Sequence, residues 1–200
     1  ALTGKDFEGV SCSICHRLVD PIYDSTENPI VDAGILAGLA QPPDDAHSGQ
    51  LVIDPDDRRR GPFDLGTNFW LHEWEQSPFH QESKLCASCH EVSNPAFTRQ
   101  GGAFPSATDT YDLNTLRTPH PTGQEFDMFP LERTFSEWEN SSFATGPVDM
   151  GGRFGGNKTA VSSCQDCHMP DLSGEACAPG LGATYRDDLP QHGFAGANSW

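Results

Sequence analysis

The 200-residue chain has few apolar residues and no long apolar run. Only 36% of its residues are hydrophobic, whereas 20 are Gly and 16 are Pro, and both favour turns over regular elements. The longest apolar stretch, Ala33 to Ala40, falls far short of the roughly 18 residues that a transmembrane helix requires. The composition therefore predicts no membrane span, and it predicts that a group other than aliphatic side chains fills much of the interior.

Positive charge is also scarce. The chain has 12 Lys and Arg residues against 29 Asp and Glu residues, which gives a formal net charge of −17. Such a chain repels nucleic acid and anionic membrane surfaces, and it attracts basic proteins and divalent cations. We therefore expect no nucleic-acid partner.

Cysteine is used in one repeated pattern. Three C-x-x-C-H segments occur, at residues 12–16, 86–90 and 164–168. This pattern is the attachment signature of c-type haem, in which two thiols bond to the porphyrin vinyl groups and the adjacent His ligates the iron. The sequence therefore predicts three haem c groups. Their thioether residues would be Cys12, Cys15, Cys86, Cys89, Cys164 and Cys167, and their proximal ligands His16, His90 and His168.

Other uses of paired cysteines explain the pattern less well. A zinc site would need two C-x-x-C pairs that close one tetrahedron, and a redox dithiol would occur once, near a βαβ pattern. Neither these nor disulfides predict a His after every pair. The seventh cysteine, Cys177, is interpreted as a buried thiol, with pairing to another chain as the alternative.

The expected fold follows from the haems, whose apolar faces would replace aliphatic side chains in the core. We predict mainly short α-helices and long ordered loops wrapped around covalently bound haems, with little β-structure. The whole of residues 1–200 would form a single triheme cytochrome domain, or one module of a longer protein. Two helices are predicted before the second motif, one around Val31 to Leu39 and one from Asn68 to Ser77.

A charged loop precedes the second motif. Its acidic residues are Asp54, Asp56, Asp57 and Asp64. These carboxylates could hold Ca²⁺ together with backbone carbonyls, but Arg58, Arg59 and Arg60 lie beside them. We favour an internal salt-bridged loop, and the arginines could equally pair with haem propionates.

Five histidines remain for the distal positions of three haems. His80 is the strongest candidate because it closes an aromatic segment before the second motif. His192 and His120 follow, the latter between two prolines that would fix its angle. His72 is held in reserve as a ligand or propionate partner, and His47 lies in a polar loop where solvation is expected. The three methionines are not favoured as ligands, so we expect mostly bis-His haems.

A weak repeat links the second and third motifs. Residues 73–80 (EWEQSPFH) align with residues 137–144 (EWENSSFA), and each copy precedes a C-x-x-C-H. Each copy is predicted to be an amphipathic helix that presents an aromatic side chain to a haem. The second copy has Ala144 where the first has His80.

Together with the His-Gly-Phe segment at residues 192–194, these motifs resemble the multihaem c-type cytochromes, particularly the cytochrome c554 and hydroxylamine-oxidoreductase-like superfamily. The resemblance implies closely stacked haems that form an electron wire. It also implies that His80 and His192 are distal ligands, each to a haem other than the nearest in sequence. Ala144 departs from that pattern.

The function predicted from these motifs is electron transfer, without substrate chemistry of the chain's own. Two alternatives stay open: a redox enzyme or gas sensor with one open haem, and a subunit of a conductive cytochrome filament. The expected partners are redox proteins, and the charge favours basic ones. Because c-type haem is attached outside the cytoplasm, we expect a periplasmic or extracellular protein whose leader has been removed.

Overall fold

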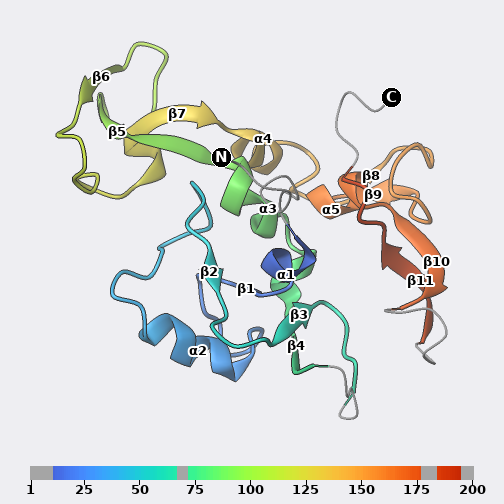
Figure 1. Cartoon of the computed structure of the whole chain (residues 1–200). Helices are drawn as coiled ribbons and strands as arrows, with labels where there is room; N and C mark the ends of the chain where they lie inside the picture. The colour runs from blue at the N-terminus through green and yellow to red at the C-terminus, as the bar shows by residue number, and fades with distance from the viewer. Residues whose placement is uncertain (1–10, 67–71, 177–183, 195–200) are drawn as a thin grey trace, which may run out of the picture. The chain divides into compact units, whose positions relative to one another are not determined.

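The computed structural model describes residues 11–66, 72–176 and 184–194. The chain divides into two compact units, Ala1–Arg133 and Thr134–Trp200 (Figure 1). The first unit carries two C-x-x-C-H motifs and the second unit carries one. The single triheme domain over residues 1–200 stays a prediction.

The prediction of a mainly helical fold wrapped around haems, with little β-structure, is wrong. Helices make up 22% and strands 26% of the structure, and the eleven strands in the described residues form small sheets. No helix in the described part of the chain has both the length and the apolar character to cross a membrane.

The first unit alternates short helices with short strands. Its helices are α1 (Cys12–Cys15), α2 (Ile30–Ala37), η2 (Pro78–Gln81), α3 (Ser83–His90) and η3 (Glu125–Asp127). Its strands are β1 (Leu18–Val19), β2 (Val52–Ile53), β3 (Arg59–Gly61), β4 (Trp74–Gln76), β5 (Val92–Gln100), β6 (Thr110–Leu113) and β7 (Met128–Glu132). The α2 helix confirms the helix predicted around Val31 to Leu39.

The largest sheet has the strand order β6-β5-β7, with all neighbours antiparallel (Figure 1). Its strands contain Pro95 and Pro130, which the composition had indicated as turn formers. Pro95 lies where the register between β5 and β7 shifts. Proline has no backbone N–H to donate, and the pairing of the two strands does not require one at this irregular position. Arg99 closes the loop between β5 and β6 by donating to Asp109 at 2.9 Å.

The predicted helix from Asn68 to Ser77 is wrong where the structure describes it; residues 67–71 lie outside the described ranges. Trp74–Gln76 forms β4, which pairs in parallel with β3. Ser77 is extended (φ −136°, ψ 108°) because the following Pro78 disfavours helical backbone at the preceding residue. The 3₁₀ helix η2 then begins at that proline.

The apolar core of the first unit is small. Val19, Leu36 and Val52 form its buried cluster, against which Tyr23 and Ile35 pack. A fully buried ion pair between Arg60 and Asp32 lies elsewhere in the same unit. The unit therefore depends on buried polar contacts as well as on apolar packing.

The second unit is built around the third motif. Its elements are α4 (Thr134–Glu139), β8 (Val148–Asp149), β9 (Ala160–Val161), α5 (Cys164–His168), β10 (Asp171–Glu175) and β11 (Tyr185–Pro190). Only Glu137 to Glu139 of the second repeat copy lie in α4, and residues 140–144 form turns, so the predicted helix is confirmed only at the start of this copy and is wrong for the first copy, which contains β4. The strands β10 and β11 pair antiparallel and return the chain to the end of α5.

Candidate haem-binding sites

Each C-x-x-C pair lies within a short helix: α1, α3 and α5. Residues three apart in a helix lie on one face, so both thiols of each motif project from the same side of one turn. The thiols range from half-buried to exposed. This arrangement suits covalent attachment of a flat group that lies against the helix.

The first motif has a proximal His with a defined tautomer. The carbonyl oxygen of Arg60 lies 2.7 Å from His16 Nδ1 and can only accept a hydrogen bond, so Nδ1 carries the proton. The neutral ring then has its lone pair on Nε2, the form that ligates a metal. The Arg60 N–H donates in return to the His16 carbonyl at 2.6 Å.

His80 lies beside His16, the predicted proximal ligand. The His16 and His80 ring centroids are 6.0 Å apart and their planes differ by 12°. His80 Nε2 is 2.8 Å from the carbonyl oxygen of Cys15, and the ring of buried Phe79 meets it edge-on. Burial lowers the pKa of His80 to about 4, with a further lowering by His16 and Arg60. The imidazole is therefore neutral at neutral pH, as ligation requires.

The second motif ends at an exposed His. His90 Nδ1 lies 3.2 Å from a carboxylate oxygen of Glu132 on β7. A carboxylate acceptor orients a ligating imidazole in the same way as a carbonyl does. The pKa of Cys15 is raised by burial and next by the Cys89 thiol, which places the first two motifs within electrostatic range of one another.

The third motif has its own local anchors. Ser163 caps α5 by accepting from the Asp166 N–H, and the Asp166 side chain accepts from the Ser163 N–H in return. This capping box holds the first turn, which carries both thiols. Trp138 Nε1 donates to the Ser162 carbonyl at 2.7 Å, which ties the second repeat copy to the start of the motif.

His192 is exposed at the base of the β10–β11 hairpin. Its Nδ1 donates to the Pro190 carbonyl at 3.0 Å, and the Gln191 N–H donates to the Pro170 carbonyl at 3.1 Å. Pro170 follows the third motif by two residues. The hairpin thus returns His192 to the neighbourhood of α5.

The structure does not place His120 beside a motif. This ring is buried and its Nδ1 accepts from the Thr122 and Gly123 N–H groups at 3.3 Å. Its Nε2 therefore donates to Thr98 Oγ1 at 3.0 Å. The His120 ring therefore links residues 120–123 to strand β5 of the β6-β5-β7 sheet. His72 is half-buried, with Nδ1 2.9 Å from the Glu73 carbonyl oxygen.

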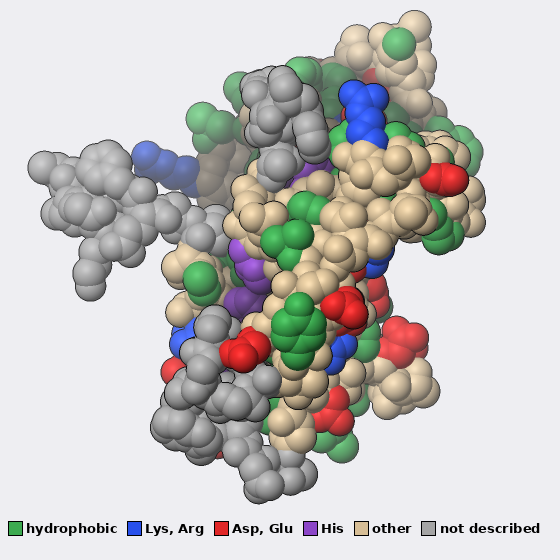
Figure 2. Space-filling view, turned by 90° about the vertical axis from the view of Figure 1, so that its right-hand side faces the viewer, with side chains coloured by type: hydrophobic (Ala, Val, Ile, Leu, Met, Phe, Trp, Pro, Cys, Tyr) green, Lys and Arg blue, Asp and Glu red, His purple; other side chains and the backbone are tan. Residues whose placement is uncertain are grey.

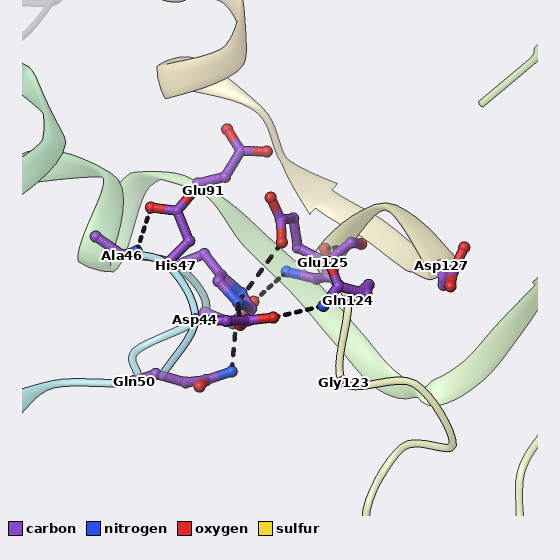
Figure 3. A network of polar contacts seen from close by, with 12 residues as sticks. Asp44, Ala46, His47, Gln50, Glu91, Gly123, Gln124, Glu125 and Asp127 are labelled. Carbon is purple, nitrogen blue, oxygen red and sulfur yellow. Dashed lines mark hydrogen bonds and ion pairs between the residues drawn. The ribbon is translucent and has the colours of Figure 1, made fainter. Parts of the chain in front are cut away.

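The expectation that His47 is solvated is wrong, because only 1% of this residue is exposed. Its loop is held against the end of α3, since Ser48 and Gly49 donate to the carbonyls of Glu91 and Ser88 at 2.7 Å. The ring lies 3.6 Å from Glu125 and 3.8 Å from Asp44 (Figure 3). Asp44 belongs to the same loop, whereas Glu125 comes from a distant segment that nothing in the local sequence signals.

The charged loop contains internal salt bridges, as predicted in preference to a Ca²⁺ site. Arg58 contacts Asp54 and Asp56 at 2.9 and 3.0 Å, and Arg59 contacts Asp57 at 2.6 Å. Within the described ranges, no three His, Cys, Asp or Glu side chains are grouped to hold a metal ion. A haem iron needs fewer protein ligands, because the porphyrin supplies four of its bonds.

No known protein family matches the chain, and neither the curated proteins nor the solved structures include a match. The class of protein is therefore argued from the three motifs and their surroundings. Cys177 lies outside the described residues.

Proposed function

We propose that the protein is an electron carrier with three covalently bound haem c groups. The observation that carries this proposal is that all three C-x-x-C-H motifs occur on single helical turns. The regular spacing and the adjacent His are what c-type attachment requires. Haem 1, haem 2 and haem 3 denote the groups at residues 12–16, 86–90 and 164–168.

The chain's residues would hold and orient these groups. Cys12 and Cys15 would bond haem 1, with His16 as its proximal ligand and His80 as its distal ligand. Haem 2 would be held by Cys86, Cys89 and His90, and haem 3 by Cys164, Cys167 and His168. A bound haem supplies one-electron exchange between ferric and ferrous iron.

The His16 and His80 pair supports the assignment for haem 1. The two rings are stacked neighbours, with centroids 6.0 Å apart and planes that differ by 12°, so one haem at α1 would find both imidazoles close to its attachment helix. A His80 ring that ligated through Nε2 would exchange its hydrogen bond to the Cys15 carbonyl for the metal bond. His192 is proposed as a second distal ligand, with His72 in reserve; His120 is not proposed, because both of its ring nitrogens are hydrogen-bonded to Thr98, Thr122 and Gly123.

The charge of −17 supports a basic redox partner. Acidic side chains occur at several separate places on the face drawn in Figure 2 and do not form one patch. The attraction to a basic partner would therefore come from the net charge of the whole surface and not from one acidic patch. Assembly into a filament is the alternative association. Because c-type haem is attached outside the cytoplasm, the proposed location is the periplasm or the cell exterior.

The experiment is to express the chain with the c-type maturation machinery and to measure its intact mass and optical spectrum. We expect the mass of three haems, loss of one haem in the double variant Cys12→Ser/Cys15→Ser, and no loss in the control Cys177→Ser. A protein that matures without bound haem would overturn the proposal.

Carbon monoxide then separates the carrier from its alternative. We expect low-spin ferric and ferrous spectra that the gas leaves unchanged. If about a third of the haem signal is high-spin and shifts with carbon monoxide, one iron is open, and the enzyme or sensor reading replaces the carrier.

A further inference from the structure

The Arg60 side chain is completely buried between two aspartates in the first unit. Its Nη2 lies 2.6 Å from Asp32 Oδ1, and its Nη1 lies 2.7 Å from Asp54 Oδ2. All three side chains have no exposed surface. Burying such a network costs desolvation energy that a well-packed apolar set would avoid. Stability alone therefore does not account for this choice of residues.

The backbone of the same segment holds the residues that follow Cys15. Arg60 exchanges two hydrogen bonds with His16: its N–H donates to the His16 carbonyl at 2.6 Å, and its carbonyl accepts from Nδ1 at 2.7 Å. The Asp54 N–H donates to the Arg17 carbonyl at 2.9 Å. The position of the proximal imidazole thus follows the position of β3.

The same strand also leads to the other imidazole. In the parallel pair of β3 and β4, Gly61 lies opposite Gln76, and the Gly61 carbonyl accepts from the Ser77 N–H at 2.8 Å. The η2 helix, which carries His80, begins at the next residue. One short strand therefore borders the backbone that positions both rings.

We propose that the buried Asp32–Arg60–Asp54 network is a positioning device for the axial ligands of haem 1. The two carboxylates fix the Arg60 guanidinium and thereby β3, whose carbonyl at Arg60 holds the His16 Nδ1 proton. This role rests on the proposed function, because it needs a haem at residues 12–16. The three network residues do not themselves touch the iron.

The role predicts a directional effect on one haem. Displacing β3 lengthens the His16 Nδ1–H hydrogen bond and lets the imidazole turn. A weaker hydrogen bond makes the ring a poorer electron donor, which stabilises ferric iron less. The potential of haem 1 should then rise, while haem 2 and haem 3 keep theirs.

The test compares Asp32→Asn with Asp109→Asn in the full, haem-loaded chain. Asp109 also pairs with a buried arginine, since Arg99 lies 2.9 Å away and both side chains are nearly buried. Both variants remove one negative charge from the first unit, but Asp109 lies in the loop between β5 and β6 and pairs with Arg99 on β5, whereas Asp32 pairs with Arg60 on β3. Haem content by mass, electron paramagnetic resonance of the ferric protein and redox titration are recorded for each.

We expect three haems in both variants, with one low-spin signal shifted and one potential raised in D32N only. Unchanged signals and potentials in D32N, or the same change in D109N, would overturn the positioning role while leaving the carrier intact. If D32N loses haem, the Arg60→Lys variant takes its place in the test. Lysine keeps the positive charge and the backbone, but it cannot bridge both carboxylates. Three unaltered signals in R60K would overturn the role. A wild-type chain without haem defeats the proposed function itself.

Discussion

His80 combines three properties that a distal ligand needs: partial burial, neutrality and closeness to a predicted proximal ring. Its pKa is lowered to about 4, chiefly by burial, so it stays uncharged over the physiological range. The adjacent Phe79 is 1% exposed and fixes the backbone of η2. At the residue scale, this is the best-defined pairing of a motif with a second imidazole in the described chain.

Replacing His80 by Ala should therefore open haem 1 without removing it, because the thioether bonds do not involve this residue. We expect about a third of the ferrous haem to bind carbon monoxide in the H80A variant, measured as a Soret shift. The control is His47→Ala, which removes a buried His that the proposal assigns to no haem, and this variant should bind none. Carbon monoxide binding in H47A but not in H80A would contradict the assignment of His80.

The three C-x-x-C-H motifs can be recognised in the sequence because each is complete within five residues; their place on short helices is seen in the structure, and the haems stay a prediction. The surroundings of His47 and His120 could not, because they depend on contacts between distant segments. His47 meets Glu125 from η3, and His120 meets Thr98 from β5. A polar loop that packs against another element has the same composition as one that faces water.

At the scale of elements, the β6-β5-β7 sheet is closed by Arg99. This side chain donates to Asp109, to the Phe126 carbonyl and to the Gly102 carbonyl. The hydrogen bond from Arg99, followed by that from the Ser106 N–H, lowers the pKa of Asp109. The loop between β5 and β6 therefore depends on an ionised carboxylate.

A group whose pKa is lower in the folded state stabilises the fold above its unfolded pKa, and this contribution is lost as the pH falls through the folded value. We expect urea unfolding to show a loss of stability below about pH 4, where Asp109 takes up a proton. The loss should be smaller in Asp109→Asn. The exposed Asp112→Asn variant on the same sheet serves as control and should retain the wild-type loss. An equal acid response in all three proteins would contradict the assignment.

The strands were missed for identifiable reasons. Pro95 and Pro130 lie within β5 and β7, where bulges and edges accommodate them. The spacing of Trp70, Leu71 and Trp74 in the sequence is typical of a helix, yet pairing with β3 and the proline after Ser77 favour a strand at Trp74–Gln76. The α2 helix was predictable because its apolar residues are contiguous in the sequence.

At the scale of the whole molecule, charge is the dominant property. The surplus of 17 negative charges surrounds a chain whose apolar cluster in the first unit is limited to a few side chains. Long-range attraction of cationic partners should therefore govern the rate of encounter.

Reduction by a cationic reagent should slow as salt is added, because the Debye length falls from about 10 Å at 0.1 M to about 3 Å at 1 M. Stopped-flow rates for the haem-loaded protein would show this decline. A neutral reductant is the control, and its rate should stay nearly constant. A cationic reagent whose rate does not depend on salt would show that the charge plays no part in encounter.

The acceptor that holds the His16 Nδ1 proton is a main-chain oxygen, so a substitution can displace this acceptor but cannot delete it. Every residue type at position 60 carries the same carbonyl, so no substitution there deletes the acceptor. The His90 Nδ1 contact instead ends on the Glu132 side chain, and a single codon change can abolish it. The two neighbouring motifs of the first unit thus differ in genetic robustness, although their local sequences follow one pattern.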